Sequence, residues 1–237
     1  MKVLLIIPAY NEEKNIVKTV GAVDKFRKSC DFELDYIVIN DGSRDNTYNV
    51  CRENNINCIN LIRNLGIGGA VQTGYKLASM KGYDIAVQFD GDGQHDINSL
   101  GNLIEPIITG QADFTVGSRF IKENDNFKST AMRRLGIKIL SLTLRLFARV
   151  KILDCTSGYR AASAEVIKML AQKYPSDYPE PESLVQIKKK GFRIEEVYAN
   201  MFEREDGVSS IRAWKSVYYM IKVTVAIIIA GFQKGEC

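Results

Sequence analysis

Short apolar runs alternate with helix-like segments through the first half of this 237-residue chain, and no other feature constrains its fold as strongly. The first run, Lys2–Pro8, is continuously apolar, as expected for a strand buried on both faces. Further strands are predicted at Tyr36–Asn40, Asn57–Ile62, Ile85–Phe89 and Phe114–Gly117. Strands that alternate with helices predict an α/β fold with a parallel, doubly wound sheet.

The segments between these strands carry helix signals. Asn11 is expected to cap a helix with Glu12 and Glu13 in its first turn, where carboxylates favour the positive end of the helix dipole. Three further helices are expected. A short one is opened by Ser43 and Asp45. A second runs from about Gly69 to Lys81 and stops at Gly82, and a third runs from a cap at Asp96 to Gly110.

The second half of the chain has a different organisation. Its predicted elements are a mobile polar loop at Lys122–Lys128, helices at Ala131–Val150 and Glu180–Lys190, and a strand at Arg193–Phe202. The stretch Ala213–Phe232 is apolar and aromatic. We therefore divide the chain into one domain over residues 1–212 and a C-terminal amphipathic helix within residues 213–237.

The composition excludes several classes of function. The net charge of +4, from 32 basic and 28 acidic residues, gives no nucleic-acid footprint. The five cysteines are scattered and odd in number, which fits reduced thiols in a cytoplasmic protein. His95 is the only histidine, so zinc sites that need several histidines are excluded.

Polar residues follow nearly every predicted strand of the first half. Ligands of such sheets bind beyond the carboxyl ends of the strands. Those ends carry Pro8-Ala9-Tyr10, Asp41-Gly42-Ser43, Arg63-Asn64, Asp90-Gly91-Asp92 and Gly117-Ser118-Arg119. The sequence therefore predicts a ligand site along one edge of the sheet.

The sharpest signal is the segment Asp90-Gly91-Asp92-Gly93-Gln94. Its carboxylate and amide oxygens are ligands that Mg²⁺ or Mn²⁺ prefers, and the glycines allow the backbone to approach a diphosphate. The interpretation is a metal that neutralises charge on a leaving group. The alternative is an ordinary turn, because Asp-Gly is common in turns.

Other strand-end residues have candidate roles. Asp41 is suited to hold a base or a ribose by hydrogen bonds, with a helix-capping turn as the alternative. Arg119 and Arg133 are suited to contact phosphates, whereas a solvated basic helix face is the alternative for the Arg133 region. His95 is expected to form hydrogen bonds beside the metal without binding it, so that His95→Ala leaves most of the turnover.

These motifs, in this order, resemble those of the family-2 glycosyltransferases, and most of all the dolichol- and polyprenyl-phosphate sugar synthases. The resemblance spans residues 1–212 and implies the GT-A fold, a mostly parallel nucleotide-binding sheet flanked by helices. It also covers the block Asp154-Cys155-Thr156-Ser157-Gly158-Tyr159-Arg160, expected as a strand under the acceptor side.

The resemblance implies a role for each group of residues. The nucleotide-sugar site comprises Pro8, Ala9, Tyr10, Glu12, Asp41, Asn64, Asp90, Gly91 and Arg204, the last on a loop expected to close over the donor. Mg²⁺ or Mn²⁺ is held by Asp90, Asp92 and Gln94. The catalytic set comprises Asp92, Arg119, Arg133, Glu180 and Glu182.

The expected reaction is an inverting transfer of a sugar from a UDP- or GDP-linked donor to a polyprenyl phosphate at the cytoplasmic face of a membrane. Glu180 and Glu182 keep a first alternative open, in which a carbohydrate hydroxyl is the acceptor and one of these carboxylates is the base. Their structural alternative is the first turn of a helix. A second alternative function is a non-catalytic sugar-nucleotide-binding partner of a membrane complex.

The apolar run within Ala213–Phe232 is shorter than the ~20 residues of a spanning helix. It predicts an amphipathic helix at the membrane interface, which makes the protein peripheral at the inner face. The aromatic side chains Trp214, Tyr218 and Tyr219 are expected at headgroup depth, with Arg212, Lys215 and Lys222 near lipid phosphates. The alternative is a helix packed on its own domain, on a membrane-protein partner or on a second copy of the chain.

Overall fold

The computed structural model describes residues 1–121, 131–177, 179–202 and 213–232, apart from the side chains of residues 131–133, 213–219 and 221. In this part of the chain, seven strands form one sheet in the order β3-β2-β1-β4-β6-β5-β7. The strands are β1 (Lys2–Ala9), β2 (Glu33–Asn40), β3 (Cys58–Asn60), β4 (Ile85–Gln88), β5 (Phe114–Ser118), β6 (Arg160–Ser163) and β7 (Ile194–Tyr198). The expected α/β fold is confirmed.

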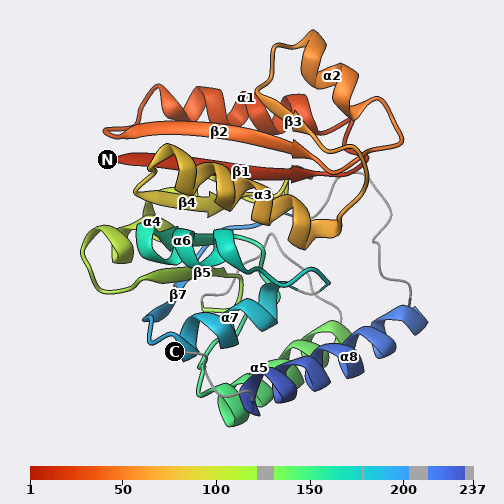
Figure 1. The fold of residues 1–237 in the computed structure, drawn as a ribbon, viewed down its shortest axis with the longest axis vertical. Helices are drawn as coiled ribbons and strands as arrows, with labels where there is room; N and C mark the ends of the chain where they lie inside the picture. The colour runs from red at the N-terminus through yellow and green to blue at the C-terminus, as the bar shows by residue number, and fades with distance from the viewer. Residues whose placement is uncertain (122–130, 178, 203–212, 233–237) are drawn as a thin grey trace.

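Helices cover both faces of the sheet (Figure 1). One face is packed by α1 (Ile16–Arg27), α2 (Thr47–Glu53) and α4 (Leu100–Ile108), which follows the short 3-10 helix η1 (Ile97–Ser99). The other face is packed by α3 (Gly66–Lys81), α5 (Ala131–Ala148), α6 (Ala164–Gln172), α7 (Pro179–Lys189) and α8 (Ala213–Phe232). Two apolar clusters therefore enclose the sheet, and its strand ends stay accessible.

The sheet is mostly parallel, as the resemblance implied, and a single antiparallel strand makes it mixed. Strands β1 to β4 run parallel, but β6 lies antiparallel between β4 and β5. Strand β6 and helix α6 were not predicted. The block from Asp154 to Arg160 was expected to be a strand, yet only Arg160 belongs to β6 and the preceding residues form a loop.

The expected helix cap at Asn11 is wrong. Asn11 has φ 58° and its side chain accepts the backbone N–H of Arg44, so the chain turns there. Helix α1 begins only at Ile16, and Glu12 and Glu13 lie before its first turn. By contrast, α3 ends at the left-handed Gly82, and Asp96 caps η1, both as expected.

Helices α5 and α8 lie side by side and parallel (Figure 1). They approach closely where glycines leave room, since Gly136 faces Met220 and Gly231 faces Phe147. Val223 and Ile227 of α8 are buried against α5 and α7. The described part of α8 thus packs on its own domain, which was the alternative to a helix that lies only at the membrane interface.

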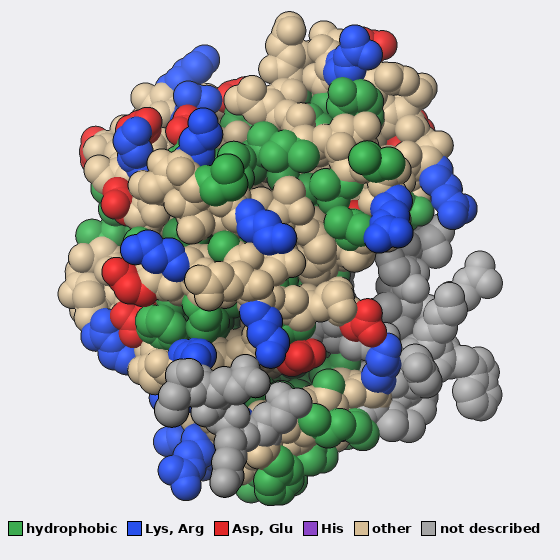
Figure 2. Space-filling model, viewed as in Figure 1, with side chains coloured by type: hydrophobic (Ala, Val, Ile, Leu, Met, Phe, Trp, Pro, Cys, Tyr) green, Lys and Arg blue, Asp and Glu red, His purple; other side chains and the backbone are tan. Residues whose placement is uncertain are grey.

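The outer faces of α5 and α8 remain apolar and exposed. The exposed side chains are Leu135, Ile139, Leu142 and Leu146 of α5, and Val225, Ile229 and Phe232 of α8. Figure 2 shows hydrophobic side chains gathered over this helix pair at the lower edge of the molecule. We call these seven side chains the α5–α8 apolar face. Within the described residues, no helix has both the length and the hydropathy needed to cross a bilayer.

Candidate active site

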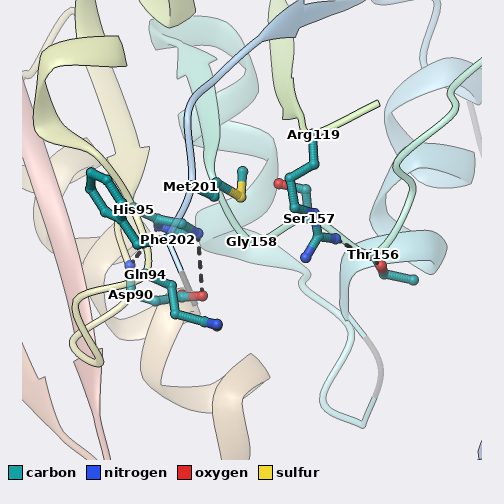
Figure 3. A pocket seen from close by; sticks show the side chains of 9 residues that line it. All are labelled: Asp90, Gln94, His95, Arg119, Thr156, Ser157, Gly158, Met201 and Phe202. Atoms are coloured by element: carbon teal, nitrogen blue, oxygen red, sulfur yellow. Dashed lines mark hydrogen bonds and ion pairs between the residues drawn. The ribbon is translucent and has the colours of Figure 1, made fainter. Parts of the chain in front are cut away.

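A polar pocket of about 160 Å³ lies beyond the ends of β4 and β5, where the sequence predicted a ligand site. Its lining residues are Asp90, Gln94, His95, Arg119, Thr156, Ser157, Gly158, Met201 and Phe202. Figure 3 shows Asp90 and Gln94 on one side of it, and Arg119 with Thr156 on the other. The expected carboxylate and the expected arginine therefore face the same small space.

His95 fixes the position of Asp90 from two sides. Its Nδ1 accepts the backbone N–H of Asp90 at 3.0 Å, so the ring proton lies on Nε2. The Nε2 atom of His95 is 3.5 Å from Oδ2 of Asp90. The imidazole is 3% exposed, stacks on Tyr159 at 4.6 Å between ring centroids and meets the edge of Phe89. Both ring nitrogens are thus directed at Asp90.

Burial is the main cause of an unusual pKa at His95. Loss of hydration disfavours the imidazolium and, with the positive charge of Arg119, lowers the pKa of His95 to about 4, although Asp92 and Asp154 oppose the change. The imidazole is therefore neutral at physiological pH.

This pKa can be measured directly, because His95 is the only histidine. We expect its imidazole NMR signals to titrate near pH 4, not near 6.5. The unfolded chain takes up this proton near pH 6.5, so the stability due to neutral His95 is complete above that pH. It declines by about 3 kcal/mol as the pH falls towards 4. A His95→Asn variant should have a flatter stability profile over this window, and an ordinary titration near pH 6.5 would contradict the prediction.

The surroundings of Asp90 fit a bound cation. The Oε1 atom of Gln88 is buried without a hydrogen-bond partner among the described residues, while its Nε2 lies 3.4 Å from Oδ1 of Asp90. A Cβ atom at Gly158 would lie 2.9 Å from Oδ2 of Asp90, so only glycine keeps this space open. The site thus combines a carboxylate with room for a ligand, and the unpartnered amide oxygen of Gln88 is buried behind it, outside the pocket lining.

The other predicted metal ligands lie in the same turn. Gln94 lines the pocket, whereas Asp92 does not, and Oδ1 of Asp92 accepts the backbone N–H of Gln94 at 3.0 Å. Within the described residues, no group of three acidic, histidine or cysteine side chains gathers as a metal site. Asp90, Asp92 and Gln94 present only oxygen ligands of the kind Mg²⁺ and Mn²⁺ prefer.

Arg119 is held in place by a buried carboxylate. Its Nε and Nη2 atoms donate to the two oxygens of Asp154, each at 2.6 Å, and Asp154 is completely buried. The guanidinium still lines the pocket, and Nη2 also reaches Thr156 at 3.4 Å. This pair gives Arg119 one fixed orientation, as bidentate contacts do.

The loop Thr156–Gly158 lines the pocket, although sequence reasoning assigned no site residue there. Arg160, itself fully buried, donates to the carbonyl oxygens of Ser157 and Cys155 at 2.6 and 2.9 Å. Its Nη1 donates to the carbonyl of Glu180 at 2.6 Å. A buried arginine thereby ties this loop to the start of α7. The Ser-Gly pair was the one local sign of a turn.

Met201 and Phe202 were also missed as pocket residues. The segment after β7 pairs with the metal-motif turn, because Phe202 donates its backbone N–H to the carbonyl of Gln94 at 2.8 Å and His95 forms a bridge with Met201. Residues 203–212, with the predicted donor loop and Arg204, lie outside the described residues. The same holds for the loop expected at Lys122–Lys128 and for the side chain of Arg133.

The predicted nucleotide residues gather beside β1 and β2. Asp41 is buried, its Oδ1 accepts the backbone N–H of Leu65 at 2.7 Å, and its own N–H donates to Ala9. Burial raises the pKa of Asp41, which hydrogen bonds from Leu65 and Gly66 oppose. The start of α3 thus orients Asp41.

The remaining predicted nucleotide residues are placed as follows. Tyr10 is exposed at the end of β1, and Pro8 and Gly91 are buried side by side. The carboxylate of buried Glu12 accepts a hydrogen bond from the side-chain amide of Asn15 at 2.8 Å. The side-chain oxygen of exposed Asn64 accepts the backbone N–H of Gly66 at 3.1 Å. They border the sheet edge that leads to Asp90.

Glu180 and Glu182 do not line the pocket. Both lie in the first turn of α7, where Glu182 contacts Gln186 at 3.3 Å. Burial raises the pKa of Glu180, against the opposing charge of Arg160. Their position is the one expected from the structural alternative of a helix start.

The model of the family "Glycosyl transferase family 2" matches residues 4–170, more than half of the chain. The chain belongs to glycosyl transferase family 2. This assignment and the sheet topology confirm the expected GT-A fold, and the protein is therefore a glycosyltransferase.

Two curated relatives of this glycosyltransferase are similar over most of their length. The UDP-N-acetylglucosamine–dolichyl-phosphate N-acetylglucosaminyltransferase of Methanococcus voltae is 36% identical over 82% of this chain and 83% of its own. The polyprenol monophosphomannose synthase of Mycolicibacterium smegmatis is 30% identical over 94% of this chain and 85% of its own.

A solved structure shares the fold. It is the glucosyl-3-phosphoglycerate synthase of Mycobacterium tuberculosis in complex with Mn²⁺, UDP and phosphoglyceric acid. The TM-score is 0.72 at 18% identity, covering 99% of this chain and 80% of that one. At this identity the likeness concerns the fold alone.

Proposed function

We propose that this glycosyltransferase moves a sugar, with inversion, from a nucleotide diphosphate sugar to the phosphate of a polyprenyl phosphate. The single observation that carries the proposal is the composition of the pocket. Of the lining residues, only Asp90 bears a carboxylate, and it lies opposite the fixed guanidinium of Arg119. Both nitrogens of His95 are directed at Asp90, so neither serves as a base.

Among the described residues that line the pocket, the one carboxylate is Asp90, which is proposed to bind the cation, and a pocket without a further base suits an acceptor that is already an anion. A sugar hydroxyl must lose a proton as it attacks, whereas a phosphate oxygen attacks without proton removal. In the proposed reaction, the acceptor phosphate oxygen forms a bond to the anomeric carbon while the bond from that carbon to the diphosphate breaks. Arg119 stabilises the negative charge that develops on the departing diphosphate. The names of the two relatives support this acceptor class.

Asp90, Asp92 and Gln94 are proposed to hold a divalent cation, Mg²⁺ or Mn²⁺. When bound, the cation neutralises charge on the diphosphate leaving group. The oxygen donors and the space kept open at Gly158 support this assignment. The related fold that was crystallised with Mn²⁺ is consistent with it. Arg133 and Arg204 stay predicted contacts of the phosphates and the donor.

The acceptor class implies a membrane surface, because a polyprenyl chain is held in a bilayer. We propose that the α5–α8 apolar face lies on that surface and that the protein is peripheral at its inner face. Exposed apolar side chains along two parallel helices are costly in water and suit the interface between headgroups and acyl chains.

The division of the chain at residue 212, into a glycosyltransferase domain and a C-terminal helix, also stays a prediction.

Product analysis tests the acceptor. Purified protein with Mn²⁺ is first screened against UDP- and GDP-sugars by thermal shift, since a ligand of the folded state raises its stability. The best donor is then offered a polyprenyl phosphate or an oligosaccharide. We expect a glycosyl polyprenyl phosphate as product, and a Glu180→Gln variant with at least half of the wild-type rate.

Two other results would point to the alternatives. Transfer to the oligosaccharide alone, lost in Glu180→Gln, would favour a hydroxyl acceptor with Glu180 as the base. Donor binding without transfer or hydrolysis would favour a non-catalytic sugar-nucleotide-binding partner.

A further inference from the structure

A second pocket, of about 210 Å³, lies away from the active site. Its lining residues are Arg149, Val150, Lys151, Ile152, Lys188 and Ile194. It lies where α5 and α7 end and β7 begins, whereas the active site lies at the other end of β7. We call it the basic pocket, because three of its six lining residues are cations and none is an acid.

In the part of the chain that the structure describes, no acidic side chain neutralises the three cations of the basic pocket. Arg149, Lys151 and Lys188 are exposed, and within the described residues none has an acidic side chain at ion-pair distance. Three positive charges around one hollow repel one another, and an anion placed among them removes that repulsion. The volume is several times the ~30 Å³ share of one water molecule, so a phosphate group fits.

Arg149 is placed there by an unusual backbone conformation. Its φ is 55°, in the left-handed region that glycine normally occupies after the last turn of a helix. A non-glycine residue in this region costs about 1–2 kcal/mol. Helix α5 ends there at Ala148, two residues before the end expected from the sequence.

The basic pocket borders exposed apolar side chains. Leu146 and Phe147 precede Arg149 and are 67% and 39% exposed, and Leu153 follows Ile152 and is 55% exposed. Phe232, at the end of α8, packs on Phe147 with ring centroids 5.9 Å apart. Figure 2 shows basic side chains beside the hydrophobic ones at the lower edge of the molecule. Cations and apolar groups therefore share one end of the α5–α8 pair.

We infer that the basic pocket binds the phosphate of an anionic phospholipid when the α5–α8 apolar face lies on a membrane. The inference rests on the proposed membrane location and adds a lipid headgroup site separate from the acceptor site. A soluble phosphate would use the cations alone. A phospholipid uses both the cations and the neighbouring apolar side chains Leu146, Phe147 and Leu153. Its phosphate lies at the level of the headgroups, and its acyl chains lie below.

The expected contribution of the pocket is large enough to measure. A lysine or arginine near an anionic membrane surface strengthens binding about fivefold, so three cations give roughly 100-fold. Salt screens such contacts beyond about 8 Å at physiological ionic strength, so the preference should decline as salt is added.

Vesicle flotation of the full chain provides the test. Wild-type protein is compared on phosphatidylcholine vesicles with and without 30 mol% phosphatidylglycerol. The variant combines Arg149→Asn, Lys151→Gln and Lys188→Gln, with asparagine at 149 because it tolerates the left-handed conformation. The control combines Lys25→Gln, Lys76→Gln and Lys168→Gln, three exposed lysines on α1, α3 and α6, and changes the net charge equally.

We expect wild type and control to prefer anionic vesicles by at least tenfold, and the pocket variant to lose that preference while still binding through its apolar face. Equal preference in all three proteins overturns the inference. So does binding of wild type to neutral and anionic vesicles alike. Saturable binding of inorganic phosphate at the pocket, with vesicle binding unchanged in the variant, assigns a soluble anion and overturns the lipid assignment.

A second measurement separates this inference from the proposed function. Turnover is measured with a short-chain polyprenyl phosphate in detergent without anionic lipid, where the pocket variant should match wild type. Failure of all proteins to glycosylate this acceptor would refute the proposed function, whereas the vesicle result would still decide the lipid site.

Discussion

Alanine in place of Asp92 is expected to lower kcat by at least a thousandfold. The carboxylate belongs to the turn that carries the proposed metal ligands, and its Oδ1 accepts the backbone N–H of Gln94. Charge stabilisation by a bound cation amounts to several kcal/mol, and about 4 kcal/mol corresponds to a thousandfold in rate. The rate should be measured at saturating donor, with Mn²⁺ affinity determined separately by calorimetry.

The control for this experiment is Asp31→Ala, which removes an exposed carboxylate far along the sequence from the site and should leave both values unchanged. His95→Ala is an informative comparison. The sequence alone predicts that most of the turnover survives, but the structure directs both imidazole nitrogens at Asp90, so we now expect an intermediate loss. Full activity in Asp92→Ala with normal Mn²⁺ affinity would show that the metal site lies elsewhere.

Alanine in place of Asp154 is expected to destabilise the fold by about 3–5 kcal/mol. The substitution would leave the side chain of Arg119, only 6% exposed, without the carboxylate that its guanidinium contacts. Removing one partner of a buried ion pair is costly because the other charge stays uncompensated. For a chain of this size that corresponds to a fall in Tm of roughly 10 °C, measurable by calorimetry.

Glu33→Ala serves as the matched control for Asp154→Ala. Glu33 pairs with Lys2 at 3.4 Å, and both side chains are more than half exposed. Exposed pairs contribute less than about 1 kcal/mol, so this variant should melt close to wild type. Similar melting of the two variants would mean that the Arg119–Asp154 pair contributes no more than a surface contact.

Local signals carried most of the fold prediction. Gly82 ends α3 and Asp96 caps η1 because each acts through its own backbone or side chain. Strand β6 has no such signal. It is four residues long, begins with an arginine and continues with small side chains, and it exists because β4 and β5 pair with it. Arg160 is completely buried, where a sequence-based prediction does not place an arginine.

Among the residues of the candidate site, too, those with local sequence signals could be predicted and those placed by long-range contacts could not. The position of Asp90, Gln94 and Arg119 beside one pocket could be predicted because parallel strand ends converge on one edge of a sheet. The pocket residues Thr156–Gly158 and Met201–Phe202 were missed. Their positions depend on contacts between distant segments, namely the hydrogen bonds of Arg160 and the pairing of Phe202 with Gln94. No periodic pattern encodes such contacts.

The order in which the strands are synthesised has a consequence for how the chain matures. Strand β6 joins β4 to β5 but is made after both of them. Until residue 163 has left the ribosome, β4 and β5 each present an open backbone edge, the kind of edge that pairs with other chains. Strand β6 closes the gap between β4 and β5, but the outer edge of β5 is covered only when β7 is made, so the first half stays prone to aggregation until both strands are in place. The insertion of β6 brings Thr156–Gly158 to Asp90, and the segment after β7 adds Met201 and Phe202, so the candidate site is completed only when both strands have joined the sheet.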